Sequence, residues 1–142
     1  MILIADSGSS KTDWRLIDNQ GNVINRKTPG LNPFFTSLPE GRDLIKNAFS
    51  SREINEVDQL YVYSAGCFHH NQKNALKKIL NTVFTNVEPK VETDLLGAAR
   101  AAWQHKNGVI AILGTGSNSG IYDGTNITMN IRPLGYILGD EG

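Results

Sequence analysis

The sequence lacks the features that mark several large classes of protein. Its 142 residues include one cysteine, Cys67, so an internal disulfide framework is excluded and a reducing compartment, the cytoplasm, is expected. Acidic and basic residues number 14 each, which leaves no net charge to attract nucleic acid or an acidic membrane. The first apolar run ends before Asp6 and is too short for a signal peptide or a membrane span. We therefore expect neither nucleic acid nor a membrane as a partner.

What the sequence does contain is typical of a folded globular protein, with 39% hydrophobic and 20% charged residues. Apolar runs, helical periodicity and turn residues predict a regular series of elements. In chain order we expect strands at 2–5, 13–18 and 22–28, a helix at 37–49, a strand at 57–63, a helix at 71–84, a strand at 87–93 and a helix at 94–105. This order, βββαβαβα, predicts an α/β fold with a mixed five-stranded sheet and helices on its faces.

A second group of strands follows beyond residue 107, at 109–113, 117–122 and 126–131. Three strands without a helix of their own bury little apolar surface and are marginal alone. We therefore expect a first domain at 1–106 and the truncated beginning of a similar second domain at 107–142.

The start of this second group repeats the layout of the N-terminus. Residues 2–12 form an apolar strand, a hydroxyl-rich turn at Gly8 and a second strand, and residues 110–118 repeat this pattern with Gly116 in the place of Gly8. Each copy then reaches an Asp-led turn, at Asp18 and at Asp123. Two such turns facing one another would surround a polyphosphate, which favours a nucleotide-dependent phosphotransferase.

The first turn carries groups suited to phosphate and to a metal ion. Asp6 lies near the carboxyl end of a buried strand, where a carboxylate can hold Mg²⁺ directly or through water. Backbone N–H groups at the turn and the hydroxyls that follow suit phosphate oxygens, and the candidates are Gly8, Ser9, Ser10, Lys11 and Thr12. The alternative is an ordinary hairpin with no ligand. A P-loop is unlike this segment, because Ser10 stands where Walker A needs glycine and a strand follows.

Asp94 is the second carboxylate of interest, since it lies where a strand passes into a helix. The helix dipole favours an ionised side chain there. Asp94 could serve only as the helix N-cap, or it could accept a proton from a substrate hydroxyl during phosphoryl transfer.

Six segments, in this order, resemble the BadF/BadG/BcrA/BcrD-type ATPase family and, within it, the N-acetylglucosamine kinase branch. They are residues 6–14, 29–33, 64–66, 93–94, 114–118 and 138–142, and they span the chain from end to end. The resemblance implies membership of the actin-like, sugar kinase and Hsp70 superfamily, which is built from two RNase H-like domains with ATP in the cleft between them.

The resemblance also implies roles for single residues. Asp6 would be the acid associated with Mg²⁺, Thr12 would contact the phosphates of ATP, and Asp94 would be the base that acts on the 6-hydroxyl of a sugar. The second phosphate loop would hold Gly114, Thr115 and Gly116, and the sugar pocket would be lined by Asn32, Ser64, Ser117, Asn118 and Asp140. One departure concerns the sugar: mammalian-type kinases carry Gly-Trp-Gly ahead of the last segment, where this chain has Pro133, Leu134 and Gly135.

The sequence thus predicts an ATP-dependent kinase that phosphorylates an amino sugar, N-acetylglucosamine or glucosamine, at the 6-hydroxyl, with ATP and Mg²⁺ as cofactors. We expect the full-length protein to carry this activity and the 142-residue piece to lack it; a homodimer is left open. Two alternatives remain. One is an activator ATPase of an acyl-CoA dehydratase or reductase, which needs cysteines for an iron–sulfur cluster and finds only Cys67 here. The other is a non-catalytic sensor of sugar or nucleotide.

Overall fold

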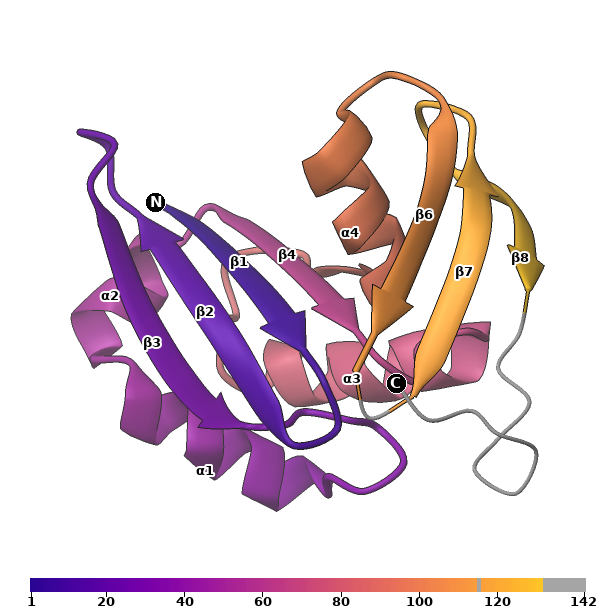
Figure 1. Ribbon diagram of the computed structural model, residues 1–142. Helices are drawn as coiled ribbons and strands as arrows, with labels where there is room; N and C mark the ends of the chain where they lie inside the picture. The colour runs from indigo at the N-terminus through magenta and orange to yellow at the C-terminus, as the bar shows by residue number, and fades with distance from the viewer. Residues whose placement is uncertain (115, 132–142) are drawn as a thin grey trace. The chain divides into compact units, whose positions relative to one another are not determined.

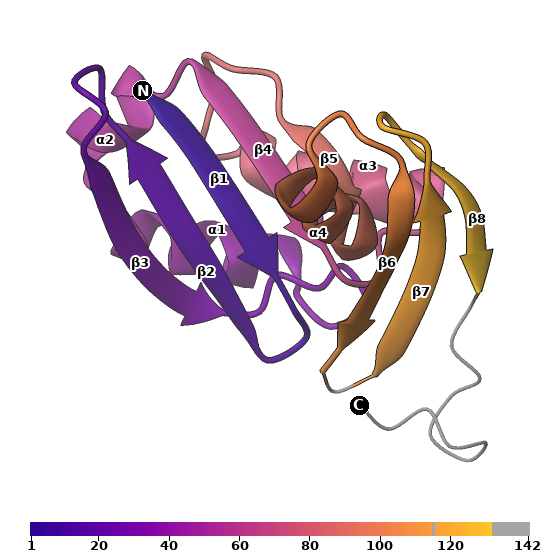
Figure 2. The ribbon, with the colours of Figure 1, turned by 45° about the horizontal axis from the view of Figure 1, so that its top comes forward.

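The computed structural model describes residues 1–114 and 116–131. The chain divides into two compact units, Met1–Asp94 and Leu95–Gly142, which are considered separately. None of the helices in the described residues has the length and apolar character needed to cross a bilayer. Figure 1 labels the elements of both units except β5, which is labelled in Figure 2.

The first unit is built on a mixed five-stranded sheet. Its strands are β1 (Ile2–Ser7), β2 (Lys11–Ile17), β3 (Val23–Pro29), β4 (Gln59–Ser64) and β5 (Lys90–Thr93), in the spatial order β3-β2-β1-β4-β5. The first three strands form an antiparallel meander, and β1, β4 and β5 run parallel to one another. The predicted α/β fold with a mixed five-stranded sheet is therefore confirmed. The carboxyl ends of β1, β4 and β5 lie at one edge of the sheet, where ligands of open α/β sheets bind.

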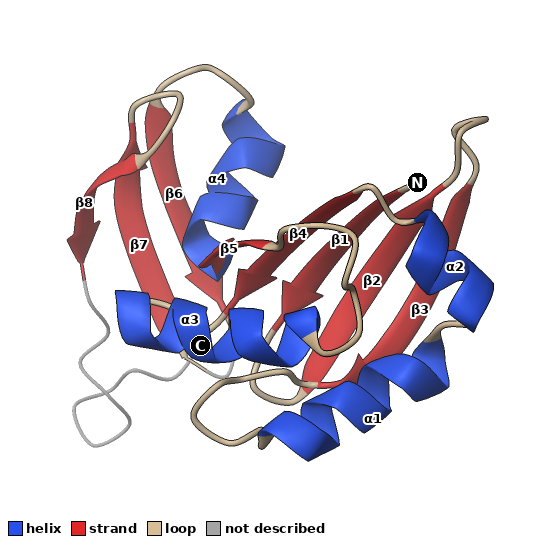
Figure 3. Ribbon diagram, turned by 180° about the vertical axis from the view of Figure 1, so that it is seen from behind, coloured by secondary structure: helices blue, strands red, loops and turns tan. Residues whose placement is uncertain are grey.

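Three helices cover one face of this sheet, as Figure 3 shows from behind: α1 (Leu38–Ala48), α2 (Ser51–Glu56) and α3 (His70–Asn81). A capping box of Ser37 and Glu40 starts α1, as the sequence predicts. The predicted order omits α2, which a second capping box starts: the Ser50 side chain accepts from the N–H of Glu53.

The core of the first unit lies between these helices and the inward side of the sheet. Alternate strand residues point into it, as the pleat requires. Those that are fully or almost fully buried include Leu3, Ala5, Trp14, Leu16, Leu60, Val62 and Val91. The Trp14 ring meets the Phe49 ring edge-on at 5.4 Å between centroids, and its Nε1–H donates to the Thr28 hydroxyl at 3.0 Å.

The second unit holds an antiparallel meander of β6 (Gly108–Leu113), β7 (Ser117–Tyr122) and β8 (Ile127–Ile131), which is seen clearly in Figure 2. Helix α4 (Asp94–Trp103) begins at the last residue of the first unit, and its Leu96 and Ala99 pack with Tyr122 in a small core. The three strands are therefore covered by a helix, contrary to the expectation of a bare meander. Compactness divides the chain at residue 94, whereas the boundary between the domains 1–106 and 107–142 stays a prediction.

Candidate phosphate and substrate site

The turn between β1 and β2 is closed by a backbone hydrogen bond from the N–H of Gly8 to the carbonyl of Lys11, at 2.9 Å. Ser7 and Thr12 form the last pair of the ladder beneath it. Ser9, Ser10 and Lys11 are exposed at the tip of the turn. Exposed hydroxyls and backbone N–H groups at such a tip are suited to an anionic ligand.

A second loop, residues 30–32, lies directly against this turn. The N–H of Gly30 donates to the carbonyl of Ser10 at 3.2 Å. A Cβ on Gly30 would stand 2.4 Å from the carbonyl oxygen of Gly8 and 2.5 Å from that of Ser9. Glycine is needed at this position because the two backbone segments touch, and the contact fixes the loop on the turn.

Five hydroxyl residues lie side by side across the sheet under this loop. Each of them is paired with the next on the neighbouring strand, from β3 to β5. The hydroxyl row comprises Thr28, Thr12, Ser7, Ser64 and Thr93. The first four are buried on the core side. Sequence reasoning missed Ser7 and Thr28, although hydroxyl residues near the ends of successive strands were a usable signal.

The hydroxyls of Ser7 and Thr12 hold the loop by its backbone. The N–H of Leu31 donates to the Ser7 Oγ at 3.0 Å and to the Thr12 Oγ1 at 3.2 Å. Both side chains are completely buried, and the two oxygens are 2.8 Å apart. The structure therefore places Thr12 beneath the loop, away from the exposed tip of the turn.

Asn32, the next residue of the loop, is predicted to bind substrate. Its Nδ2 donates to the Ser9 Oγ at 3.3 Å, and its Oδ1 accepts from the N–H of Phe34 at 3.0 Å. Gly66, whose φ is +79°, lies in the turn after β4. It is so close to Asn32 that an added Cβ would lie 3.0 Å from the Asn32 Oδ1. The fold thus brings together three segments that are far apart in the sequence, around Ser9, Asn32 and Gly66.

Ser64, another predicted substrate residue, is fully buried at the end of β4, where its hydroxyl donates to the carbonyl of Ala65 at 3.0 Å. The N–H of Ala65 donates in turn to the carbonyl of Ser7 at 2.8 Å. The turn after β4 is therefore tied to the end of β1 by backbone as well as by register.

Asp6 lies on the other side of β1, opposite Asp13 of β2. Partial burial raises the pKa of Asp6, the negative charge of Asp13 raises it further, and the cations of Lys11 and Arg15 oppose both effects. Asp13 is bound by Lys11 at 3.0 Å and Lys27 at 3.8 Å, and its pKa is lowered, chiefly by the hydrogen bond from Lys11. Among the described residues, Asp6 makes no such bond, so it remains available to a cation.

Asp94 is the first residue of α4 and directly follows Thr93, the β5 member of the hydroxyl row. The charge of Asp94 affects the pKa of Cys67. Burial is the main cause that raises the pKa of this thiol, the negative charges of Asp94 and Glu92 raise it further, and the Ser64 hydrogen bond and the Lys73 cation lower it. The position suits either interpretation of Asp94, as helix cap or as base, and both stay predictions.

The second turn, between β6 and β7, follows the same plan. Leu113 pairs with Ser117 at the end of the ladder, as Ser7 pairs with Thr12 in the first hairpin. The N–H of Gly114 donates to the carbonyl of Gly116 at 3.0 Å. Gly114 is therefore the counterpart of Gly8, and the sequence match of Gly8 with Gly116 was wrong. The second turn is one residue shorter than the first, so the glycines of the two turns do not correspond at a constant offset in the sequence.

The far ends of the two hairpins support the repeat. The Asp18 carboxylate accepts from the N–H groups of Gln20 and Asn22, and the Asp123 carboxylate accepts from those of Thr125 and Asn126. Backbone hydrogen bonds lower the pKa of Asp123; at Asp18 the side-chain hydrogen bond from Asn22 comes first and backbone bonds add to it.

Asn118 is buried in β7 beside the second turn, with its Oδ1 accepting from the Asn130 Nδ2 at 2.7 Å. Its own Nδ2 is buried and has no acceptor within the described part of the chain. A buried unsatisfied donor is costly and calls for an explanation such as a ligand. Two other predicted site residues, Thr115 and Asp140, lie outside the described residues.

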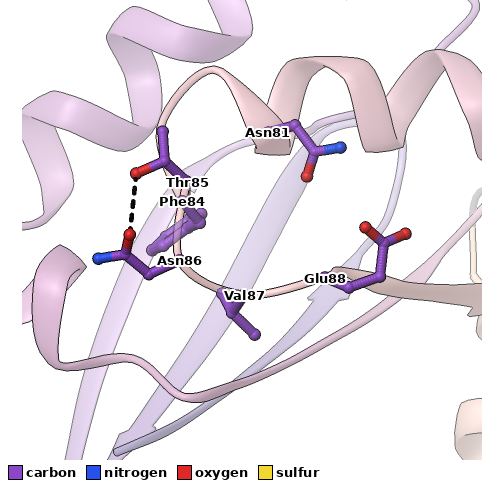
Figure 4. A pocket seen from close by; sticks show the side chains of 6 residues that line it. All are labelled: Asn81, Phe84, Thr85, Asn86, Val87 and Glu88. Atoms are coloured by element: carbon purple, nitrogen blue, oxygen red, sulfur yellow. Dashed lines mark hydrogen bonds between the residues drawn. The ribbon is translucent and has the colours of Figure 1, made fainter.

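A pocket of about 440 Å³ lies elsewhere, at the end of α3 and the segment that follows it (Figure 4). Its lining comprises Asn81, Phe84, Thr85, Asn86, Val87 and Glu88, none of which is a predicted site residue. It holds no pair of groups arranged for catalysis.

Comparison with solved structures gives matches along almost the whole chain. A protein from Porphyromonas gingivalis described as a "putative N-acetylglucosamine kinase" is 38% identical, with a TM-score of 0.88, over 99% of this chain and 50% of that one. MreB 5 of Spiroplasma citri, bound to AMPPNP, is 13% identical with a TM-score of 0.61, over 94% and 52%. The chain has the actin-like ATPase fold.

A second protein described as a "putative N-acetylglucosamine kinase", from Chromobacterium violaceum, has a similar fold, with 19% identity and a TM-score of 0.60 over 99% of this chain and 52% of that one. The resemblance to proteins described as N-acetylglucosamine kinases is confirmed by the 38% identity to the Porphyromonas gingivalis protein. The chain spans about half the length of these matched structures. No family model matches the chain, and no curated protein matches it.

Proposed function

We propose that the full-length protein is an ATP-dependent kinase that phosphorylates N-acetylglucosamine or glucosamine at the 6-hydroxyl. The observation that carries the proposal is the carboxylate of Asp6, which has no bonded partner among the described residues, beside a turn of backbone N–H and hydroxyl groups. The 38% identity to the Porphyromonas gingivalis protein supports a sugar as the acceptor.

The residues present fit ATP and Mg²⁺. Mg²⁺ is usually held by one or two carboxylates together with water and phosphate oxygens, and Asp6 can supply one such ligand. Burial is the main cause of the raised pKa of Asp6, and a cation there would also relieve the repulsion from Asp13 that adds to it. When bound, Mg²⁺ neutralises charge on the phosphates.

The chain's own residues would divide the work between phosphate and sugar. The turn of Gly8, Ser9, Ser10 and Lys11 would bind phosphate oxygens, and Gly114 and Gly116 would do so from the second unit. Asn32, Ser64, Ser117 and Asn118 would hold the sugar hydroxyls, with the buried Nδ2 of Asn118 finding its acceptor there. Asp94 would accept the proton of the 6-hydroxyl as that oxygen bonds to the γ-phosphorus of ATP, while the bond from this phosphorus to the β–γ bridging oxygen breaks and ADP leaves.

The test uses the full-length protein with ATP, Mg²⁺ and a panel of N-acetylglucosamine, glucosamine, N-acetylmannosamine and glucose. We expect release of ADP that depends on an amino sugar, and a product phosphorylated on oxygen 6 by NMR. Sugar binding without turnover would instead identify a sensor. Release of ADP with no preference for amino sugars would contradict the proposed substrate class.

The variant Asp94→Asn tests whether Asp94 is the catalytic base or only a helix cap. As the proposed base it should lower kcat by about 10²–10⁴-fold while sugar binding is retained. A helix cap alone would leave kcat almost unchanged, because asparagine caps helices as well as aspartate does. The 142-residue chain alone should show no sugar-dependent turnover.

A further inference from the structure

The loop that carries Asn32 is suspended from side-chain hydroxyls of the sheet. No element of secondary structure covers residues 30–32, so its backbone groups need other partners. The N–H of Leu31 finds two, the hydroxyl oxygens of Ser7 and Thr12, and the carbonyl of Leu31 lies 3.5 Å from the Ser64 Oγ.

The direction of the hydroxyl protons follows from these partners. The Thr12 hydroxyl donates to the carbonyl of Pro29 at 3.3 Å, and the Thr28 hydroxyl donates to the same carbonyl at 3.0 Å. The single hydroxyl proton of Thr12 is already donated to Pro29, so Ser7 is the donor in the 2.8 Å hydrogen bond between Ser7 and Thr12. The donors therefore run from Ser7 to Thr12 to Pro29, and both oxygens remain acceptors for Leu31.

We propose that Ser7 and Thr12 are positioning residues for the substrate loop, and that Thr12 does not bind the phosphates of ATP. The kinetic consequences of this inference rest on the proposed function. Both side chains are 0% exposed, and the one proton of each hydroxyl is already donated within the protein. A phosphate oxygen has neither access to Thr12 nor a donor to meet there.

The exposed hydroxyls of the turn differ in this respect. Ser9 and Ser10 stand at the surface, and only Ser9 has a side-chain partner among the described residues, the Asn32 Nδ2. Ser10 and Thr12 therefore have different roles in one short hairpin. Ser10 is exposed, where a ligand could reach it. Thr12, two residues later on the same side of the strand as Trp14, is buried and supports the loop from within.

Four variants of the full-length protein test this division: the double variant Ser7→Ala/Thr12→Val, the single Thr12→Val, the conservative Thr12→Ser, and Ser10→Ala as the matched change in the turn. Valine keeps the shape of threonine and removes the hydroxyl. The double variant should raise the KM for the sugar about tenfold with the KM for ATP within about twofold, because the Leu31 N–H loses both acceptors and Asn32 shifts.

Thr12→Ser should restore the sugar KM to within about twofold of the original, since its hydroxyl can reach the same partners. Ser10→Ala should give the opposite division, with a higher KM for ATP and an unchanged KM for the sugar. A higher KM for ATP in Thr12→Val, with the sugar KM unchanged, would overturn the inference.

Hydrogen exchange supplies a readout that does not need kinase activity. In the double variant, amide exchange in peptides spanning residues 30–34 should quicken at least about tenfold, while peptides from β4 stay protected. Unchanged exchange at residues 30–34 would overturn the inference even if the protein proves to be a sensor. If the unaltered protein shows no sugar-dependent turnover, this result counts against the proposed function and leaves the support of the loop by Ser7 and Thr12 unaffected.

Discussion

Replacing Gly30 with alanine should destabilise the first unit by wedging its loop away from the β1–β2 turn. The added Cβ would lie 2.4 Å from the Gly8 carbonyl oxygen, and real Cβ atoms essentially never approach closer than 3.0 Å. The backbones must therefore separate by at least about 0.6 Å, the difference between these two distances. Both obstructing atoms are backbone, so no side chain can turn aside.

The cost can be placed on a scale. Overpacking in a well-packed region costs about 1–3 kcal/mol, and here the shift also stretches the bond from Gly30 N–H to the Ser10 carbonyl. We expect a loss of about 2 kcal/mol in the free energy of unfolding. Gly8→Ala is the matched control: its Cβ would lie 3.6 Å from the nearest atom, so we expect a change within about 0.5 kcal/mol.

Urea unfolding followed by tryptophan fluorescence measures both variants, because Trp14 is fully buried in the core of the first unit. With a slope near 2 kcal/mol per molar urea, Gly30→Ala should lower the midpoint by about 1 M, and Gly8→Ala should lower it hardly at all. Equal midpoints for the two variants would refute the steric argument. So would a larger loss in Gly8→Ala.

Three further predictions concern single side chains. The hydrogen bond from Arg26 holds the pKa of Glu53 at about 2. The stabilisation of the folded state by this pair is therefore fully present above pH 4.5 and is lost as the pH falls toward 2. In acid unfolding, Glu53→Gln should remove about 1 kcal/mol of this pH dependence of the free energy of unfolding. Cys67 is buried with a raised pKa, so iodoacetamide should alkylate it at pH 8 only after urea unfolding, and rapid labelling of folded protein would contradict this. Asp123→Ala should quicken amide exchange at Thr125 and Asn126, whereas equal protection would show that the carboxylate does not hold the turn.

Much of the fold could be predicted because its signals are local. Alternating apolar residues and the turns at Asp18 and Asp123 gave the strands to within a few residues, and Ser37 with Glu40 gave the start of α1. Helix α2 was missed because six residues are too few to show a helical period, although Ser50 and Glu53 form its capping box.

The predicted strand at 87–93 was too long at its start, since β5 begins only at Lys90. Val87 packs against the core from outside the sheet, so an apolar residue there marks burial without marking a strand.

The candidate site could be predicted only in part. Asp6, the hydroxyl-rich turn and Asn32 stood out by residue type and by resemblance. The support that Ser7 and Thr12 give to Leu31 depends on a contact between residues 19 and 24 positions apart, which no local pattern announces. The counterpart of Gly8 was likewise misplaced, because only the strand ladder shows that Gly114 begins the second turn.

The contact between Gly30 and the turn has a consequence for how ligands would communicate. Gly30, in the segment that would meet the sugar, is joined to the turn that would meet phosphate by one backbone hydrogen bond, to the Ser10 carbonyl, and by a contact that leaves no room for a Cβ. A ligand that displaces the turn would therefore displace Gly30 as well, and it would alter the affinity of the loop to the extent that Leu31 and Asn32 follow. By thermodynamic linkage the effect is reciprocal and equal in free energy. In the proposed kinase, coupling between nucleotide and sugar within the first unit would pass through Gly30, and it would stay small where the hydroxyls of Ser7 and Thr12 hold Leu31 in place.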